Sequence, residues 1–327
     1  MRLKKNVKIT GIAILVAAGL FAGFHFLDSK EESEPTEVSE QTPATTSSDY
    51  HHITYDGKEY EFNSQIATIL FMGVDSTDGD GIGRADTIQL YLLNRIDEKM
   101  DVIGLSRDIQ TYVRVFDLQH NDMGWSQTHL ALAYSYGTTP LNGAMLTSQA
   151  VSRLLHNIPI NYFVAVDLTK LSLVHSIVGE LEVVVPTDSL ADKNPEWTAG
   201  KTITLTQDNV ELFLRSRQTD INFSNNDRMQ RQMTYLNAFF EKIKEMLDKD
   251  FDKTVSKLYN VSKDLITNIS LSDIESFAKM LITFSYDEST DYHLIEGENK
   301  LGNFNDEFYV DEELLSKMIV DLFYKED

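Results

Sequence analysis

Two aspartates frame a glycine-rich segment early in the folded part of the chain. Asp75 ends one apolar run and Asp86 opens the next, with Gly79, Gly81 and Gly83 between them. Carboxylates at two neighbouring strand ends can converge on one hard cation. Mg²⁺ takes one or two protein carboxylates and fills its shell with phosphate oxygens and water. A solvated acidic turn has the same composition, so this segment alone leaves both interpretations open.

Arginines form the second group of candidate residues. Arg107-Asp108 directly follows an apolar run, and Arg215-Ser-Arg217 alternates along an expected strand end, which would place both arginines on one face. Arg228 and Arg231-Gln232 share one face of an expected helix start. Because guanidinium groups bind phosphate through paired, charge-assisted hydrogen bonds, the set indicates a phosphate site. Any single arginine can equally form a structural ion pair with a carboxylate.

Composition and missing motifs exclude several other functions. The chain has 327 residues with 29 basic and 51 acidic side chains, a net charge of −22, which disfavours a general nucleic-acid binder. It has no cysteine, so disulfides, thiolate metal sites and cysteine nucleophiles are excluded. H-E-x-x-H and G-x-S-x-G do not occur, and the glycine-rich segment lacks the Lys-Ser/Thr of a P-loop.

The amino end predicts a membrane anchor. Ile9–Leu27 is an apolar run close to the length that spans a bilayer as a helix. Basic residues precede it and acidic residues follow it, so residues 1–8 are expected in the cytoplasm and the remainder outside the cell membrane. A cleaved signal peptide is the alternative, although its apolar region is usually shorter. Residues 28–50, rich in Ser, Thr, Glu and Pro, predict an extended linker before a domain at 51–327.

Short β-type runs alternate with helical patterns in this outer domain. Strands are expected at Thr68–Met72, Thr87–Leu93, Asp101–Leu105, Tyr162–Val166 and Glu182–Val185. Helices are expected at Leu141–His156, Met229–Leu247, Ser272–Ile282 and Leu314–Phe323. A capping-box pattern from Ser272 to Glu275 opens the third of these helices. The alternation indicates an α/β or α+β domain with helices packed on a central sheet.

Six short fragments occur in a fixed order between about Ile66 and Glu241. They are Thr68-Ile-Leu-Phe-Met-Gly-Val-Asp75, Gly83-Arg-Ala-Asp-Thr87, Leu105-Ser-Arg-Asp108, Ala131-Leu-Ala-Tyr-Ser-Tyr-Gly137, Phe213-Leu-Arg-Ser-Arg217 and Arg228-Met-Gln-Arg-Gln232. Ile158–Asp167 adds a further match. Each fragment is weak alone, but together and in this order they make the chain similar to the LytR-CpsA-Psr (LCP) family. The anchor and outer domain agree with this resemblance independently.

The resemblance implies a fold and an activity. The fold is an α-β-α sandwich, with a central mixed sheet flanked by helices after one transmembrane helix. Residues 66–241 form its core and 242–327 a C-terminal extension of helices and strands. The acidic composition of the segment after Phe284 predicts a small extra layer with a solvated surface. Family members transfer glycopolymers, such as teichoic acid or capsule, from a polyprenyl-pyrophosphate lipid to peptidoglycan in Gram-positive envelopes. Nine apolar residues would line the lipid pocket or form ordinary core: Met145, Leu146, Val151, Leu154, Leu155, Phe163, Leu173, Val174 and Ile177.

The resemblance also implies roles for individual residues. Asp75 and Asp86 would bind Mg²⁺, or alternatively Mn²⁺. Arg107, Asp108 and Arg217 are the expected catalytic residues. The residues expected to bind substrate are Arg84, Arg215, Arg228, Arg231 and Gln232. Metal and arginines would neutralise charge on the transferring phosphoryl group and its leaving group. Asp108 would orient Arg107, accept a proton from the attacking hydroxyl, or serve the structure alone.

Four positions depart from the family pattern. Thr77 and Thr128 stand where an arginine and a lysine are usual, Asn225 replaces a common aspartate, and Ser106 replaces a proline. The lost charges motivate an alternative function: a non-catalytic protein that binds lipid pyrophosphate or polymer and regulates envelope assembly. A regulator acting directly on DNA is disfavoured, because an outer domain of this charge has neither the location nor the electrostatics.

Overall fold

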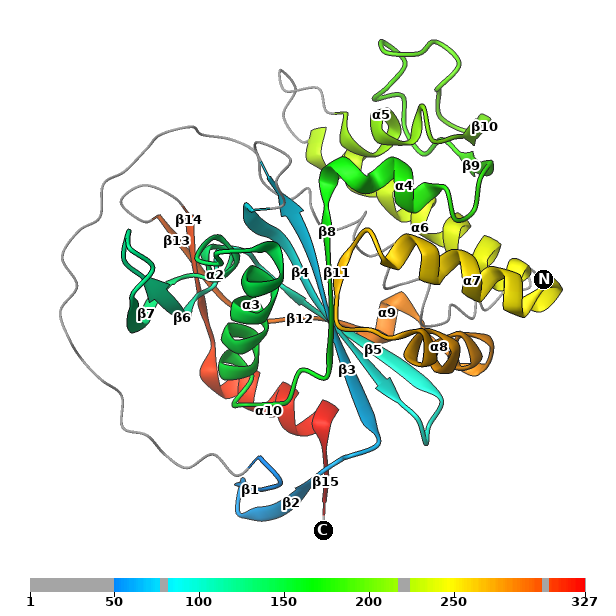
Figure 1. Ribbon diagram of the computed structural model, residues 1–327. Coiled ribbons are helices and arrows are strands. Elements are labelled where there is room, and N and C mark those ends of the chain that lie inside the picture. Colours follow the sequence, from blue (N-terminus) through cyan, green and yellow to red (C-terminus); the bar gives the residue numbers. More distant parts are fainter. Residues whose placement is uncertain (1–49, 77–81, 217–223, 302–305, 327) are drawn as a thin grey trace.

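A six-stranded mixed sheet forms the centre of the molecule (Figure 1). The computed structural model describes residues 50–76, 82–216, 224–301 and 306–326. The strand order is β11-β8-β3-β4-β5-β12. These strands are β3 (Ile66–Asp75), β4 (Arg84–Asn94), β5 (Lys99–Leu105), β8 (Tyr162–Asp167), β11 (Ile266–Thr267) and β12 (Tyr292–Leu294). β3 is antiparallel to β4 and parallel to β8, whereas β5 is antiparallel to β4 and parallel to β12.

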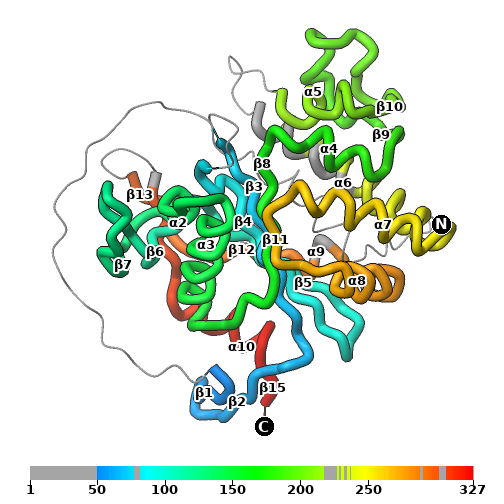
Figure 2. Tube along the Cα trace, in the orientation of Figure 1, coloured from blue at the N-terminus to red at the C-terminus, as the bar shows by residue number. Residues whose placement is uncertain are grey.

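Both faces of the sheet are covered, so its central strands are buried along nearly their whole length. One face packs against α4 (Leu171–His175), α5 (Val210–Arg215), α6 (Ser224–Lys249), α7 (Phe251–Ser262) and α8 (Leu271–Thr283). The other face packs against α2 (Leu132–Ser135), α3 (Pro140–Leu154) and α10 (Glu312–Phe323). Figure 2 shows these two groups of helices on opposite sides of the sheet. The expected α/β sandwich with a mixed central sheet is therefore confirmed.

Smaller elements surround this core. β1 (His52–Tyr55) and β2 (Lys58–Phe62) pair with β15 (Tyr324–Glu326) at the far end of the chain. Three further two-stranded sheets are β6 (Gln110–Phe116) with β7 (Asp122–His129), β9 (Leu181–Val184) with β10 (Thr202–Leu205), and β13 (Gly297–Leu301) with β14 (Asp306–Val310). A 3₁₀ turn at Leu168–Lys170 and the short helix α9 (Glu288–Asp291) complete the list.

The structure corrects three sequence expectations. Arg215 ends helix α5 rather than a strand, because Val210, Phe213 and Leu214 are buried at helical spacing. The capping box of α8 is formed by Ser270 and Asp273, two residues before the predicted pair. The segment after Phe284 is not an added layer, because β12 extends the central sheet and α10 packs into the core.

The nine apolar residues considered for a lipid pocket do not gather in one place. Val151, Leu154 and Phe163 are buried on the α3 side of the sheet, whereas Val174 and Ile177 are buried on the α4 side. They therefore cannot line a single cavity. The predicted anchor at residues 9–27 and the linker at 28–49 lie outside the described residues. Within the ranges that are described, no helix combines the length and apolar character needed to cross a membrane.

Candidate active site

The chemistry-bearing residues of four strands meet at one edge of the central sheet. Because β3, β5 and β8 run in the same direction, they end at this edge, where antiparallel β4 begins. Asp75 pairs in register with Arg84, and Asp86 lies two residues further along β4. The turn carrying Arg107 leaves the end of β5 beside them. The carboxyl ends of strands are the usual place for ligands in open α/β sheets.

A β-bulge aims Asp86 into this edge. Gly73 pairs with Thr87 and Val74 pairs with Ala85, so Asp86 has no partner across the ladder. A bulge bends its strand and redirects the side chain of the extra residue. The carboxylate of Asp86 is thereby buried within reach of Arg107, with its side chain only 2% exposed. Sequence periodicity could not reveal this, because the bulge breaks the alternation that periodicity relies on.

Arg107 is held between two carboxylates. Its Nη1 atom lies 3.1 Å from Asp86 Oδ1, and its Nε atom lies 3.6 Å from Asp108 Oδ1. A tight turn sets this position: the Ile109 amide donates to the Ser106 carbonyl, and the Asp108 amide donates to Ser106 Oγ at 3.2 Å. Ser106, the residue that replaces a family proline, therefore contributes a hydrogen bond to the turn that carries Arg107.

The Asp86 carboxylate is buried and incompletely hydrogen-bonded. Burial raises the pKa of the Asp86 carboxyl, the charges of Arg107 and Arg84 oppose that rise, and the charge of Asp75 adds to it. Despite the ion pair with Arg107, the Oδ1 atom accepts no well-directed hydrogen bond from the described residues. Clusters of three or more His, Cys, Asp or Glu side chains able to hold a metal are absent from the described ranges. Mg²⁺ needs only one or two carboxylates beside a phosphate ligand, so Asp75 and Asp86 fit it.

A hydrogen-bond network that sequence reasoning missed supports the end of β3. The Ser76 hydroxyl, next to Asp75, donates to Asp167 Oδ2 at the end of β8. Asp167 Oδ1 accepts from the amide and hydroxyl of Thr169 at 2.8 and 2.7 Å. Burial and the Asp167 charge together raise the pKa of the neighbouring Tyr134. Asp167 belongs to one of the family fragments, but the 91-residue separation from Ser76 gave no signal of this contact.

Gly83 allows the chain to return close to β3. A Cβ atom at this position would overlap the backbone carbonyl of Asp75, so a side chain would force the two strand ends apart. The Ser135 hydroxyl at the end of α2 donates to the Gly83 carbonyl at 3.0 Å. Glycine is therefore required here for close backbone approach rather than for an unusual φ angle.

The remaining predicted arginines are placed differently. Arg215, at the end of α5, is half-buried, and its Nη1 donates to Glu211 one turn earlier. Arg217 lies outside the described residues. The backbone of Arg228 and Gln232 runs in the first turns of α6, while their side chains are outside the described part. Of the predicted group, the structure thus brings together Asp75, Arg84, Asp86, Arg107 and Asp108.

Arg231 does not match its expected role in binding substrate. Its side chain is buried, and its three guanidinium nitrogens donate to the Phe213 carbonyl, the Ser216 carbonyl and Ser189 Oγ. Burial lowers its pKa to about 10, which leaves the group charged at neutral pH. Arg231 is therefore a structural residue that ties α6 to the end of α5.

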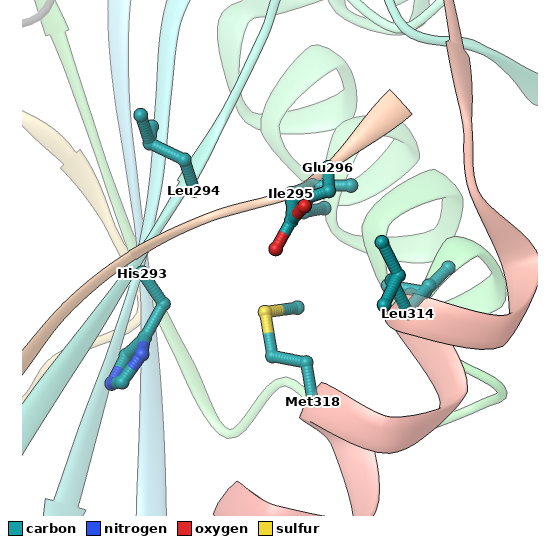
Figure 3. Close-up of a pocket in the computed structure, with 7 residues that line it drawn as sticks. His293, Leu294, Ile295, Glu296, Leu314 and Met318 are labelled. Atoms are coloured by element: carbon teal, nitrogen blue, oxygen red, sulfur yellow. The ribbon is translucent and has the colours of Figure 1, made fainter. Parts of the chain in front are cut away.

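A cavity of about 240 Å³ lies between β12 and α10 (Figure 3). Its lining residues are His293, Leu294, Ile295, Glu296, Leu314, Leu315 and Met318. Glu296 brings a negative charge, and His293 Nε2 is already 2.9 Å from Asp101 Oδ1. Since neither arginine nor lysine lines this cavity, it is unsuited to a pyrophosphate.

Fold and site together define a mixed α/β protein with carboxylates and an arginine gathered at the strand ends. The model of the LytR_cpsA_psr family matches residues 27–322, so the chain belongs to that family. The similarity read from the six sequence fragments is thereby confirmed.

Named relatives are transferases of teichoic acid. The polyisoprenyl-teichoic acid–peptidoglycan teichoic acid transferase TagU of Enterococcus faecalis is 27% identical over 218 residues, 66% of this chain and 66% of that protein. The corresponding TagV of Bacillus subtilis is 26% identical over 283 residues, 83% of this chain and 65% of that protein. The matches therefore span slightly less than two thirds of these relatives. The crystal structure of B. subtilis TagV aligns with a TM-score of 0.59 at 25% identity, covering 80% of this chain and 96% of that one.

Proposed function

We propose that this protein is a membrane-anchored, extracytoplasmic phosphotransferase. It would move a glycopolymer of teichoic acid or capsule type from a polyprenyl-pyrophosphate lipid to peptidoglycan. The observation that carries this proposal is the buried Asp86–Arg107 pair beside Asp75 at the strand edge. The names of the relatives support the general activity. The apolar run at Ile9–Leu27 supports the anchor and the outer location.

The reaction would follow from the charges at the site. An acceptor hydroxyl oxygen attacks the polymer-bearing phosphorus and releases its proton to solvent, while the bond to the lipid phosphate breaks and leaves its electron pair on that phosphate. Mg²⁺ bound by Asp75 and Asp86 would neutralise phosphate charge. Arg107 would stabilise negative charge that develops on the transferring group, since a buried donor already in position costs little reorganisation. The 3.6 Å contact between Arg107 Nε and Asp108 favours a positioning role for Asp108.

Polymer transfer by the full chain in detergent tests this proposal. With a labelled lipid-linked polymer, peptidoglycan and Mg²⁺, Asp75→Asn is expected to lower the rate about 100-fold or more, because a cation ligand is lost. Asp208→Asn, at an exposed position before α5, is the matched control and should retain the wild-type rate. Normal transfer by Asp75→Asn would contradict the proposal. Tight lipid binding by a folded wild type that transfers nothing would favour the regulatory alternative.

A further inference from the structure

An arginine that lies over two aromatic rings is found outside the site described above. The Arg153 guanidinium carbon, in the last turn of α3, is 5.3 Å from the ring centroid of Tyr112 on β6. It is 4.9 Å from the ring centroid of Trp125 on β7. Arg114, the cross-strand partner of Trp125, lies 5.7 Å from the same indole. All four side chains are partly exposed. We name these four residues the hairpin platform.

Of the two arginines of the hairpin platform, Arg114 has a carboxylate partner and Arg153 has none among the described residues. Arg114 forms an ion pair with Asp122 across the hairpin. Across the described ranges, Arg153 has contacts with the two rings and with no carboxylate. Stacking occupies the faces of a guanidinium but leaves its in-plane N–H donors available for an anion. In a chain of net charge −22, the two rings thus hold the Arg153 guanidinium at the surface with N–H donors available to an anion.

The platform is joined directly to the turn that carries Arg107. β6 begins just after Asp108, and the Ala131 amide beyond β7 donates to the Arg107 carbonyl at 3.1 Å. At about 3.3 Å per residue along the strand, Arg114 lies roughly 20 Å from Asp108. Figures 1 and 2 show the hairpin beside α2 and α3, and α3 packs against β6. A polymer leaving the phosphate site along β6 would reach the platform.

We infer that the hairpin platform binds the sugar–phosphate backbone of the donor glycopolymer, beyond its reacting pyrophosphate. This inference rests on the proposed function and adds a second contact with the same substrate. Arg153 donates to a phosphodiester oxygen, and the exposed parts of Trp125 and Tyr112 pack against the apolar faces of sugar units. A strongly acidic protein repels a polyanion, so a cationic contact away from the metal offsets part of that repulsion.

Binding of a lipid-free polymer of sugar units joined by phosphodiesters to the full-length protein in detergent tests the inference. Arg153→Gln keeps a side chain of similar length and is expected to weaken binding roughly tenfold, the loss typical of one charged hydrogen bond. Raising the salt concentration should weaken wild-type binding more than binding by the variant. Arg153→Lys keeps the charge but loses the planar fork, and an intermediate affinity is expected. Arg95→Gln, at an exposed position in the turn after β4, is the matched control.

Each outcome separates the inference from the proposed function. Unchanged polymer affinity in a folded Arg153→Gln variant would overturn the inference. So would a variant that loses affinity for peptidoglycan fragments but not for the polymer, because the platform would then serve the acceptor. Cleavage of a polymer-free polyprenyl pyrophosphate by the wild type tests the proposed function alone. Its absence, together with weakened polymer binding by Arg153→Gln, would refute the transferase and leave polymer binding standing.

Discussion

Replacing Arg107 with alanine is expected to lower polymer transfer by about 100- to 1,000-fold, the usual loss when one preorganised donor is removed from a reaction centre. Arg107 forms the ion pair with the buried Asp86 carboxylate, with its Nη1 atom 3.1 Å from Asp86 Oδ1. Its removal also leaves a buried carboxylate without its ion-pair partner. The rate constant for transfer and the free energy of unfolding, measured on the same preparation, report the two effects separately.

The stability of the Arg107→Ala variant should depend on pH. Burial already raises the pKa of Asp86 above its ordinary 3.8, and Arg107 is the strongest opposing charge. Without Arg107 the pKa of folded Asp86 rises further, above its already raised value in the wild type. Stability relative to the wild type should therefore fall as pH rises from the folded-state pKa of the wild type to the higher pKa of the variant. Arg107→Lys restores charge but not the planar fork, so it should recover stability more than activity. Wild-type transfer by Arg107→Ala would refute the role of Arg107.

Replacing Arg231 with methionine is expected to lower the free energy of unfolding by about 3 kcal/mol, because buried acceptors lose charged donors. The guanidinium serves the carbonyls of Phe213 and Ser216 and the hydroxyl of Ser189, all in the region where α5 ends. Methionine fills much of the same space but can donate to none of them. Urea unfolding at neutral pH, where Arg231 is charged, measures the difference.

Arg215→Met is the matched control for this experiment. Arg215 is the same residue type at the end of α5, but it is half-buried and pairs with Glu211 one turn away. Such surface pairs contribute at most about 1 kcal/mol, so the control should be nearly as stable as the wild type. Equal stability of the Arg231 and Arg215 variants would show that the buried bonds of Arg231 contribute little.

The central fold could be predicted because its strands are long, apolar and separated by clear breaks. β3, β4, β5 and β8 each contain a predicted run and extend it by one to a few residues. The prediction of secondary structure failed where a short sequence pattern was compatible with both a strand and a helix. Arg215-Ser-Arg217 alternates like a strand, yet the apolar residues just before it have helical spacing and form α5. For α8, the pattern from Ser272 to Glu275 predicted the capping box, whereas Ser270 and Asp273 form it in the structure.

The candidate site was predictable as a set of residue types but not as a geometry. Asp75, Asp86 and Arg107 could be named as candidates because they lie at the ends of predicted strands and within the family fragments. The bulge that turns Asp86 inward depends on the pairing of β3 with β4. The sequence did not distinguish Arg231 from the other predicted arginines. Only tertiary packing shows that its side chain is buried and donates to the Phe213 carbonyl of α5. Long-range contacts such as Ser76 with Asp167 leave no local trace.

The most direct test is cleavage of a polyprenyl pyrophosphate by the purified full chain, with and without Mg²⁺. Release of lipid monophosphate or inorganic phosphate would be followed for the wild type and for Asp86→Asn, which keeps the shape of the side chain but removes its charge. We expect release by the wild type only when Mg²⁺ is present, and a loss of about 100-fold or more in the variant. Equal release without the metal, or by Asp86→Asn, would contradict a phosphotransferase centred on Asp75, Asp86 and Arg107.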